Sequence, residues 1–427
     1  MKTTLKLAFA VLVVSLVAFF ILTALGVQPI IAYAATSISS SLFFLAVCAM
    51  LIKEEVPAGY FFALLAVGVL LRIAFAAVHP VGSPDYYRYV WDGKVQASGV
   101  NPYRYAPEDS ALTALHSDLV PRLVTYSDMR TIYPPLSENL FRLAYIISGE
   151  SYLGIKFLLL IFDVLTMLGL LLTMKKLKID RKYLLLYALC PLPMIQFFLD
   201  GHVDSFGFTF LIFALYFYLA ERKTLAYLFI GLSMLIKPLA LIVVPVLFFN
   251  EKGALNRLKA AAVPVLLFGA FYLPYVFTGS PFQALMKFTE NWTFNGVVFD
   301  ILDSFIRDNQ RTRVLCAILL MIAYLPVILS KRDLLTKIYV SIFLLFIFSP
   351  IVHPWYIGWL VVLLPLVPRW SGIAYAGLSS LTAFTILTYQ TTGVWNDYTL
   401  VLVFEYAPVI LLFLWELRRK PETLAGS

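Results

Sequence analysis

The feature that most constrains this chain is a series of apolar runs, each about as long as a membrane-spanning helix. One of them, FLLLIFDVLTMLGLLLTM, begins at Phe157. Hydrophobic residues make up 61% of the chain and charged residues only 14%, which excludes a soluble globular fold. A helix of about 20 apolar residues crosses the hydrocarbon core of a bilayer, so we predict an all-α polytopic membrane protein with about 12–14 transmembrane helices.

The predicted spans can be placed along the chain from these runs. They lie near residues 5–25, 30–52, 58–78, 153–174, 183–199, 205–220, 224–236, 238–249, 258–277, 313–329, 335–350, 354–368, 371–390 and 398–417. Lys237-Pro238 separates two of them, and proline breaks a helix. We therefore predict two half-depth helices with Lys237 at their outward tip; one long span is the alternative.

The basic residues orient these spans. Most of the 33 Lys and Arg fall in loops and span ends on one side, as in 175–182 and 418–420. This positive-inside pattern marks the cytoplasmic side, places both termini there, and explains the net charge of +8 without a nucleic-acid partner. We expect a multi-pass protein of the plasma (inner) membrane. The segments left outside are 79–152, 200–204, 278–312, 353–356 and 391–397.

The largest outer loop, 79–152, opens with a charged motif. Asp85, Arg88 and Asp92 are spaced to share one face of a helix that begins near Pro84. An acid beside an arginine stays ionised, and it can accept a proton from a hydroxyl once substrate desolvates it. A helix-capping aspartate with a surface salt bridge is the alternative. Neighbouring tyrosines favour a sugar or lipid-headgroup site: Tyr86, Tyr87 and Tyr89.

The same loop contains two rigid turns and two amphipathic stretches. GVNPY includes Asn101 and Tyr103, and YPP begins at Tyr133; such turns are either scaffolding or part of a site. Residues 112–123 and 134–148 mix apolar and polar residues at helical spacing. We predict both stretches to be interfacial helices.

Three further outer segments contain polar and aromatic candidates. In LDGHVDS, Asp200, His202 and Asp204 could bind a metal or form a hydrogen-bonded acceptor site, since the ligand set is generic. The other candidates are Trp292 and Asn295 in ENWTFNG, and His353, Trp355 and Tyr356 in SPIVHPWY.

Two basic residues lie within predicted spans, where charge is costly and usually functional. Arg72 and Lys237 could each bind a lipid phosphate. Snorkelling to the interface is the alternative for Arg72. Lys237 has no acid near it in sequence, which favours a phosphate partner.

The order of the motifs resembles that of a known superfamily. The motifs are SPDYYRYVWDG, GVNPY, YPP, GHVDS, LIKP, WTFNG and HPWY. From about Leu71 onwards the chain resembles the GT-C membrane glycosyltransferases, and among them bacterial polyprenol-phosphate-mannose-dependent mannosyltransferases. The resemblance implies two N-terminal helices in residues 1–57, a catalytic core in 58–427, and a main extracytoplasmic loop in 79–152.

The resemblance also implies an activity. We expect an enzyme that transfers a hexose, mannose by the resemblance, from a polyprenyl phosphate to an acceptor hydroxyl on a glycolipid or glycan, with inversion. Asp85 would be the base and Asp92 its reserve. The paired acidic motif common in related enzymes is absent, so no cofactor is expected and a divalent metal is not favoured.

The remaining candidates take binding roles in this scheme. The donor phosphate would be bound by Lys237, Arg88, Arg72 and His353. The substrates would meet Tyr89, Trp91, Asn101, Tyr103, Tyr133, Asp200, His202, Asp204, Trp292, Asn295, Trp355 and Tyr356.

Two other classes of protein would also bury charges among apolar spans. A transporter or flippase of lipid-linked sugars should show paired repeats with broken helices and a midplane site. No repeat is visible, and the polar residues cluster in loops on one side. A non-catalytic assembly subunit would tolerate loss of Asp85 and Lys237.

Overall fold

The structure is a computed structural model that describes residues 1–418 of the chain. Over this range it is helical, with no β-strand and with isolated bridges at Ser117–Pro121 and Phe294–Ile351. The chain divides into two compact units, each made of separate stretches of sequence.

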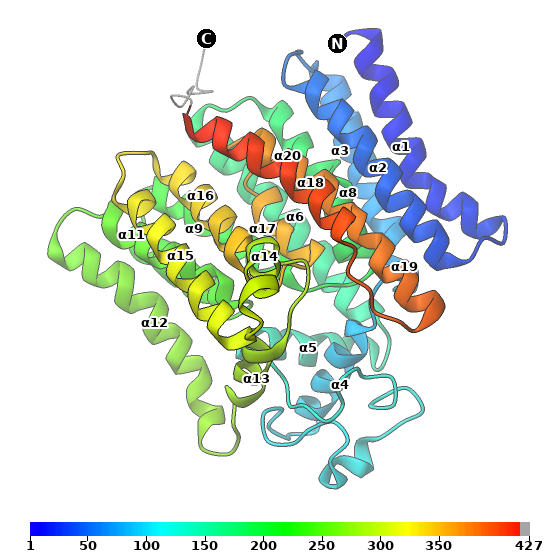
Figure 1. Cartoon of the computed structure of the whole chain (residues 1–427), viewed down its shortest axis with the longest axis vertical. Helices are drawn as coiled ribbons and strands as arrows, with labels where there is room; N and C mark the ends of the chain where they lie inside the picture. Colours follow the sequence, from blue (N-terminus) through cyan, green and yellow to red (C-terminus); the bar gives the residue numbers. More distant parts are fainter. Residues whose placement is uncertain (419–427) are drawn as a thin grey trace. The chain divides into compact units, whose positions relative to one another are not determined.

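Unit 1 comprises residues 1–82, 170–199 and the chain from 352 onwards. Helix α6 (Leu153–Leu177) begins in unit 2 and ends in unit 1. The other elements of unit 1 are α1 (Thr3–Ala24), α2 (Pro29–Leu51), α3 (Ala58–Ala76), η2 (Arg181–Leu184), α7 (Leu185–Ala188), α8 (Pro191–Pro193), η3 (Met194–Leu199), α17 (Pro354–Val361), α18 (Trp370–Leu378), η5 (Ser379–Thr382), α19 (Ala383–Thr392) and α20 (Thr399–Arg418) (Figure 1).

The interior of unit 1 is apolar with a few paired polar groups. Helix α1 packs on α2, and α2 packs on α18 and α19. Hydrogen bonds join α18 to α20: the Ser371 hydroxyl donates to Glu416 Oε2 at 2.5 Å, the Ser371 amide donates to Glu416 Oε1 at 3.2 Å, and the Tyr375 hydroxyl donates to that of Tyr406 at 2.7 Å. Buried polar groups of this kind are stable because each finds a partner.

Unit 2 comprises residues 83–169 and 200–351. Its elements are α4 (Asp85–Ala97), η1 (Ser110–Leu115), α5 (Pro135–Ser148), α9 (Asp204–Leu219), α10 (Lys223–Met234), η4 (Pro238–Ile242), α11 (Val243–Asn250), α12 (Ala254–Val276), α13 (Gln283–Asn291), α14 (Val297–Ile306), α15 (Asn309–Leu329) and α16 (Leu334–Phe348).

Helices α4 and α5 pack closely against each other (Figure 1). Gly93 makes this approach possible, because a side chain at this position would collide with the Phe141 carbonyl group on α5. Pro135 lies in the first turn of α5, where its missing amide hydrogen breaks no helical bond. The α4–α5 pair is the support on which the candidate site is built.

Within residues 1–418, eight helices are long and apolar enough to cross a membrane, or nine if a bent pair counts as one span. The bent pair consists of Arg181–Ala188 and Pro191–Leu199 and turns by 43°. The other predicted spans are shorter: α9, α10, η4–α11 and α16 are apolar helices of 10–17 residues, and α17 has 8 residues. The fold is thus a polytopic all-α membrane protein, as predicted.

The expected break at Lys237-Pro238 is present. Helix α10 ends at Met234, and η4 begins at Pro238 with Lys237 in extended conformation before it. Proline supplies no amide hydrogen and restricts the residue before it, so the helix cannot continue through this point.

The interfacial helix predicted over 112–123 is wrong, whereas the one over 134–148 is α5. Only η1 forms in the first stretch, and turns follow it. The Ser117 hydroxyl accepts from the backbone of Leu119 and Val120, which offers the chain an alternative to helical bonds. Pro121 then disfavours helix at the preceding residue.

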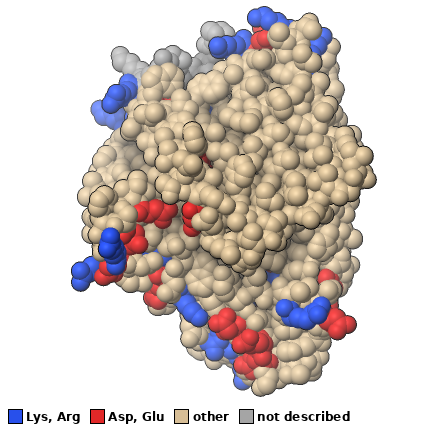
Figure 2. Space-filling model, turned by 45° about the vertical axis from the view of Figure 1, so that its right-hand side comes forward, with Lys and Arg blue, Asp and Glu red and all other residues tan. Residues whose placement is uncertain are grey.

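The long helices expose the apolar side chains that a soluble protein would bury. Exposed examples are Leu7 on α1, Leu70 on α3, Leu266 on α12 and Leu400 on α20. Figure 2 shows a broad area without charged side chains, and the Lys, Arg, Asp and Glu residues collect away from it. Such an apolar surface is stable against lipid chains, because its side chains have no hydrogen-bonding groups that the bilayer would leave without partners.

Candidate functional site

The site begins at the first residue of α4. Pro84 precedes the helix and Asp85 opens it, so its carboxylate lies at the helix N-terminus, where the peptide dipoles favour negative charge. The Ser83 hydroxyl accepts from the Asp85 amide at 3.2 Å. About a third of the Asp85 side chain, 32%, is exposed.

A second segment, the loop before α9, contributes two side chains. His202 Nδ1 lies 3.6 Å from Asp85 Oδ2, and Asp204 is the first residue of α9. Both side chains are buried. Gly201 turns the loop with a φ of 84°, a left-handed conformation that glycine adopts without strain.

The third segment is the helix break after α10. Lys237 Nζ lies 2.8 Å from Asp204 Oδ1 and 3.0 Å from Oδ2. No acid lies near Lys237 in the sequence, but Asp204, which is distant in sequence, is adjacent in space. Four of the predicted residues therefore form one cluster within unit 2: Asp85, His202, Asp204 and Lys237, called the acid–lysine cluster below.

The surroundings shift the pKa of Asp85 to about 6. Burial is the largest cause because it disfavours the charged carboxylate, and the nearby Asp204 charge acts in the same direction. Lys237, the bond to Ser83 and the charge of Arg88 oppose the rise. A carboxyl group with this pKa is mostly ionised at pH 7 and is a stronger base than an ordinary aspartate.

One residue beside this cluster, Lys156, was not predicted. Lys156, in the first turn of α6, is buried, lies over the Tyr152 ring at 4.8 Å and is attracted by Asp200. The Tyr86 ring contacts that of Tyr87 in a tilted arrangement and meets Tyr152 edge-on. A charge at the start of an apolar span was the available signal for Lys156. The predicted residue Asp200 is thus buried next to a lysine.

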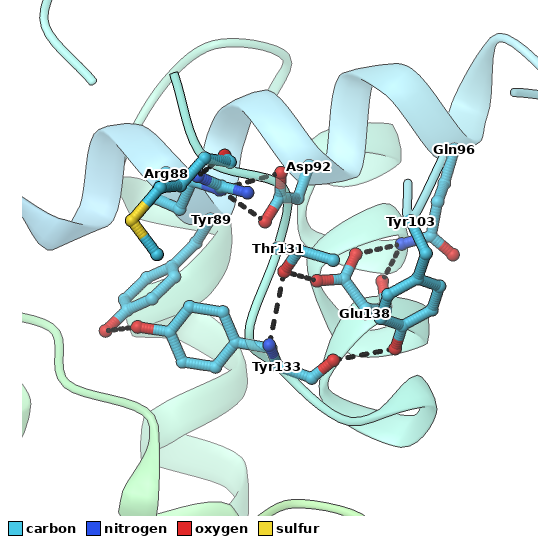
Figure 3. A network of polar contacts seen from close by, with 9 residues as sticks. Arg88, Tyr89, Asp92, Gln96, Tyr103, Thr131, Tyr133 and Glu138 are labelled. Carbon is cyan, nitrogen blue, oxygen red and sulfur yellow. Dashed lines mark hydrogen bonds and ion pairs between the residues drawn. The ribbon is translucent and has the colours of Figure 1, made fainter. Parts of the chain in front are cut away.

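Arg88 and Asp92 interact with each other rather than with the acid–lysine cluster (Figure 3). Arg88 Nε donates to both carboxylate oxygens of Asp92, at 2.9 and 3.0 Å, and its Nη1 donates to the Met129 carbonyl. Asp92 is 2% exposed. This geometry departs from the expectation of Arg88 as a phosphate ligand and of Asp92 as a reserve base, because both groups are already satisfied inside the protein.

Two aromatic residues of α4, Tyr89 and Trp91, pack inside the protein and are not exposed to solvent. Trp91 is buried and meets His116 edge-on, with ring centroids 5.6 Å apart. The Tyr89 ring stacks on Phe141 at 4.8 Å. Both side chains are almost fully buried, and their predicted contact with substrate stays a prediction. The Tyr89 hydroxyl lies 3.4 Å from that of the half-buried Tyr133.

Asn101 and Tyr103 act as scaffolding. The Asn101 side chain accepts from the Tyr103 amide at 2.9 Å and donates to Thr278 at 2.8 Å. The Tyr103 hydroxyl donates to the Tyr133 carbonyl at 2.6 Å, and its ring packs in the core with Tyr272. The predicted substrate role does not fit these internal bonds, and the scaffold alternative does.

Arg72 is a structural residue of unit 1. It is 1% exposed, and its guanidinium donates to the carbonyls of Gly68, Tyr187 and Ala188. The last two belong to the end of α7, where helical carbonyls lack partners and favour a cation. Neither phosphate binding nor snorkelling describes this buried arginine.

The remaining predicted residues lie in two places. In unit 1, His353 stacks on Trp355 with centroids 4.2 Å apart and meets Tyr356 edge-on. In unit 2, Trp292 meets a tyrosine, Tyr126, edge-on, and Asn295 is buried with a φ of 53°. The binding roles of these residues stay predictions.

In residues 1–418, no group of three or more His, Cys, Asp or Glu side chains is arranged to hold a metal ion. The Asp200–Asp204 loop instead places its acids next to lysines, Asp204 with Lys237 and Asp200 with Lys156. Each of these two acids therefore has a lysine ammonium group as its neighbour.

Comparison with known families agrees with this chemistry. Residues 14–250, more than half of the chain, match the N-terminal domain of the alpha-(1->6)-mannopyranosyltransferase family, and residues 296–418 match the MptB C-terminal domain. The first match includes α2 and the second half of α1. No curated protein is a match for the chain. The chain therefore belongs to the MptA/MptB family of alpha-(1->6)-mannopyranosyltransferases and is a membrane-embedded mannosyltransferase.

Proposed function

We propose that this enzyme transfers mannose from a polyprenyl monophosphate to an acceptor hydroxyl on a glycolipid or glycan, with Asp85 as general base. The observation that carries the proposal is the acid–lysine cluster, in which a carboxylate of raised pKa lies beside a histidine and a paired lysine. These are the groups that a transfer from a sugar phosphate requires.

In the proposed reaction Asp85 removes the proton of the acceptor hydroxyl as the oxygen attacks the anomeric carbon of mannose. The bond from this carbon to the phosphate oxygen breaks, and the electron pair leaves with the phosphate. Lys237 stabilises the negative charge of the leaving group, and His202 orients the phosphate or the acceptor. One in-line displacement inverts the anomeric centre, so an α-(1→6) product requires a β-linked donor.

We further propose that the reaction takes place on the extracytoplasmic face of the plasma membrane. The support is the distribution of Lys and Arg, which are dense in the short loops opposite the loop that contains Asp85. Nucleotide sugars are confined to the cytosol, so a site on the outer face needs a lipid-linked donor. Lysine neutralises the phosphate charge in this proposal, and no cofactor is required.

The proposal is tested with purified protein in proteoliposomes, supplied with polyprenyl-phosphate [³H]mannose and a lipid acceptor. Asp85→Asn keeps the size of the side chain but removes its basicity, so we expect loss of transfer with the donor still bound. The matched control is Asp180→Asn, which changes an exposed aspartate that caps a turn in unit 1. Normal transfer by Asp85→Asn would refute the base assignment.

A further inference from the structure

We propose that Glu138 is a positioning residue for mannosyl transfer: it holds the segment Thr131–Tyr133 against α4 and thereby sets the Tyr133–Tyr89 hydroxyl pair next to Asp85. The inference rests on the role of Asp85 proposed above. Glu138 touches no reacting atom in this scheme, and it acts through the tyrosines.

The Glu138 carboxyl group is fully enclosed and held from two sides (Figure 3). Gln96 Nε2, on α4, donates to Glu138 Oε2 at 2.8 Å and to the Glu138 carbonyl at 2.6 Å. The Thr131 hydroxyl donates to Glu138 Oε1 at 2.6 Å. The Glu138 side chain, on α5, is therefore hydrogen-bonded both to α4 and to the 129–133 segment.

The charges of this network favour a neutral Glu138. Arg88 balances one carboxylate, and its closest partner is Asp92. Burial first, and then the Asp92 charge, raise the pKa of Glu138 well above its usual range. A proton on Glu138 leaves a single buried ion pair in this network, Arg88 with Asp92.

The network leads to the site through Thr131. The Thr131 hydroxyl, which donates to Glu138, also accepts from the Tyr133 amide at 3.2 Å. The Tyr133 ring meets Tyr89 edge-on with centroids 5.3 Å apart, and the two hydroxyls lie 3.4 Å apart. Tyr89 is one helical turn after Asp85, and the Asp85 charge contributes to its raised pKa, after burial and Tyr133. Through Thr131, Glu138 thus fixes the position of the Tyr133 and Tyr89 hydroxyls near Asp85.

The test is a double-mutant cycle between Glu138→Ala and Tyr133→Phe, read as initial rates of mannosyl transfer in proteoliposomes. We expect Glu138→Ala to lower kcat about 10- to 100-fold with little change in KM, because a misplaced group reduces the reactive population rather than binding. If Glu138 acts through Tyr133, the double variant is no slower than the slower single variant. Glu138→Gln, a neutral side chain of the same shape, should restore kcat to within about threefold of wild type.

Controls separate positioning from general stability. Glu416→Ala removes another buried acid, hydrogen-bonded to Ser371, and should lower Tm without changing kcat of the folded protein. Where Glu138→Ala does not fold, Thr131→Val cuts the same link and takes its place in the cycle. The inference is overturned if the two effects multiply, if Glu138→Ala lowers only Tm, or if Glu138→Gln is as slow as Glu138→Ala.

The same assays distinguish this inference from the proposed function. Failure of the wild-type protein to use the polyprenyl-phosphate donor, or full activity of Asp85→Asn, removes the proposed function. Loss of transfer in Asp85→Asn together with multiplying effects in the cycle leaves that function standing and removes only the role of Glu138.

Discussion

Lys237 and Asp204 are 33 residues apart in sequence, yet the lysine ammonium lies 2.8 Å from a carboxylate oxygen of the aspartate. The pair joins the helix break after α10 to the first turn of α9. The ion pair with Asp204 holds the Lys237 ammonium group in this position. An entering phosphate can then share the lysine without the site having to bury a new isolated charge.

Lys237→Met should lower kcat/KM about 100-fold, the size of effect expected when one charge-stabilising group is lost from a transition state. The change also removes a charge that lowers the pKa of Asp85, so less Asp85 is ionised at neutral pH. Initial rates in proteoliposomes measure the effect. Lys223→Met breaks a comparable pair with Glu251, 2.8 Å apart, and is the control. Equal rates for the two variants would contradict the phosphate role of Lys237.

The rate should depend on pH through Asp85. Its pKa of about 6 lies above the ordinary value because burial disfavours the carboxylate. A base acts only when it is deprotonated, so kcat/KM should rise as the pH passes through about 6 and level off above it. In Lys237→Met the midpoint should move to higher pH, because the stabilising positive charge is gone. A midpoint near 4, or one that stays in place in the Lys237 variant, would argue against Asp85.

Local sequence patterns correctly predicted the helix start and the helix break at the site, but they did not predict the contacts that the site residues make. The i, i+3, i+7 spacing after Pro84 correctly indicated a helix from Asp85, and Lys237-Pro238 correctly indicated a helix break. These signals are contained in a few adjacent residues, because helix capping and proline geometry are local effects.

The partners of the charged residues could not be found in this way. Arg72 bonds to the Ala188 carbonyl, 116 residues away, and a pattern of neighbours cannot contain that relationship. The sequence likewise does not tell which face of α4 is buried, so Trp91 looked available for a sugar although it is enclosed. The 112–123 stretch had helical spacing, but Ser117 and Pro121 favoured turns.

Arg72→Met should destabilise the protein rather than disable the site. The change removes three hydrogen bonds from a buried site, to the carbonyls of Gly68, Tyr187 and Ala188, and a buried group left without any partner costs about 1–3 kcal/mol. We expect a lower Tm in detergent and a normal kcat for the protein that remains folded. Arg181→Met, which removes an exposed arginine of the same unit, should change Tm much less. A loss of kcat at unchanged Tm would instead support the predicted role of Arg72 as a phosphate ligand.

Chelation of divalent cations should leave the rate unchanged. In the proposed mechanism Lys237 neutralises the phosphate, and Asp204 already has this lysine as its partner. Initial rates with EDTA, compared with rates after addition of Mg²⁺ or Mn²⁺, test this expectation. Loss of activity that one of these ions restores would instead assign Asp200 and Asp204 to a metal, since carboxylate oxygens suit both ions.

The two sides of the membrane can be distinguished by labelling single cysteines with a membrane-impermeant maleimide. All three native cysteines are buried, so background labelling should be low and can be measured in the parent protein. Thr113→Cys, in the exposed part of η1, should react in intact cells, because the loop that contains Asp85 is proposed to face outwards. Lys176→Cys, exposed near the end of α6 in a basic loop, should react only after the cells are opened, because dense Lys and Arg mark the cytoplasmic side. The reverse pattern would place Asp85 on the cytosolic face, where nucleotide sugars are present, and would remove the argument for a lipid-linked donor.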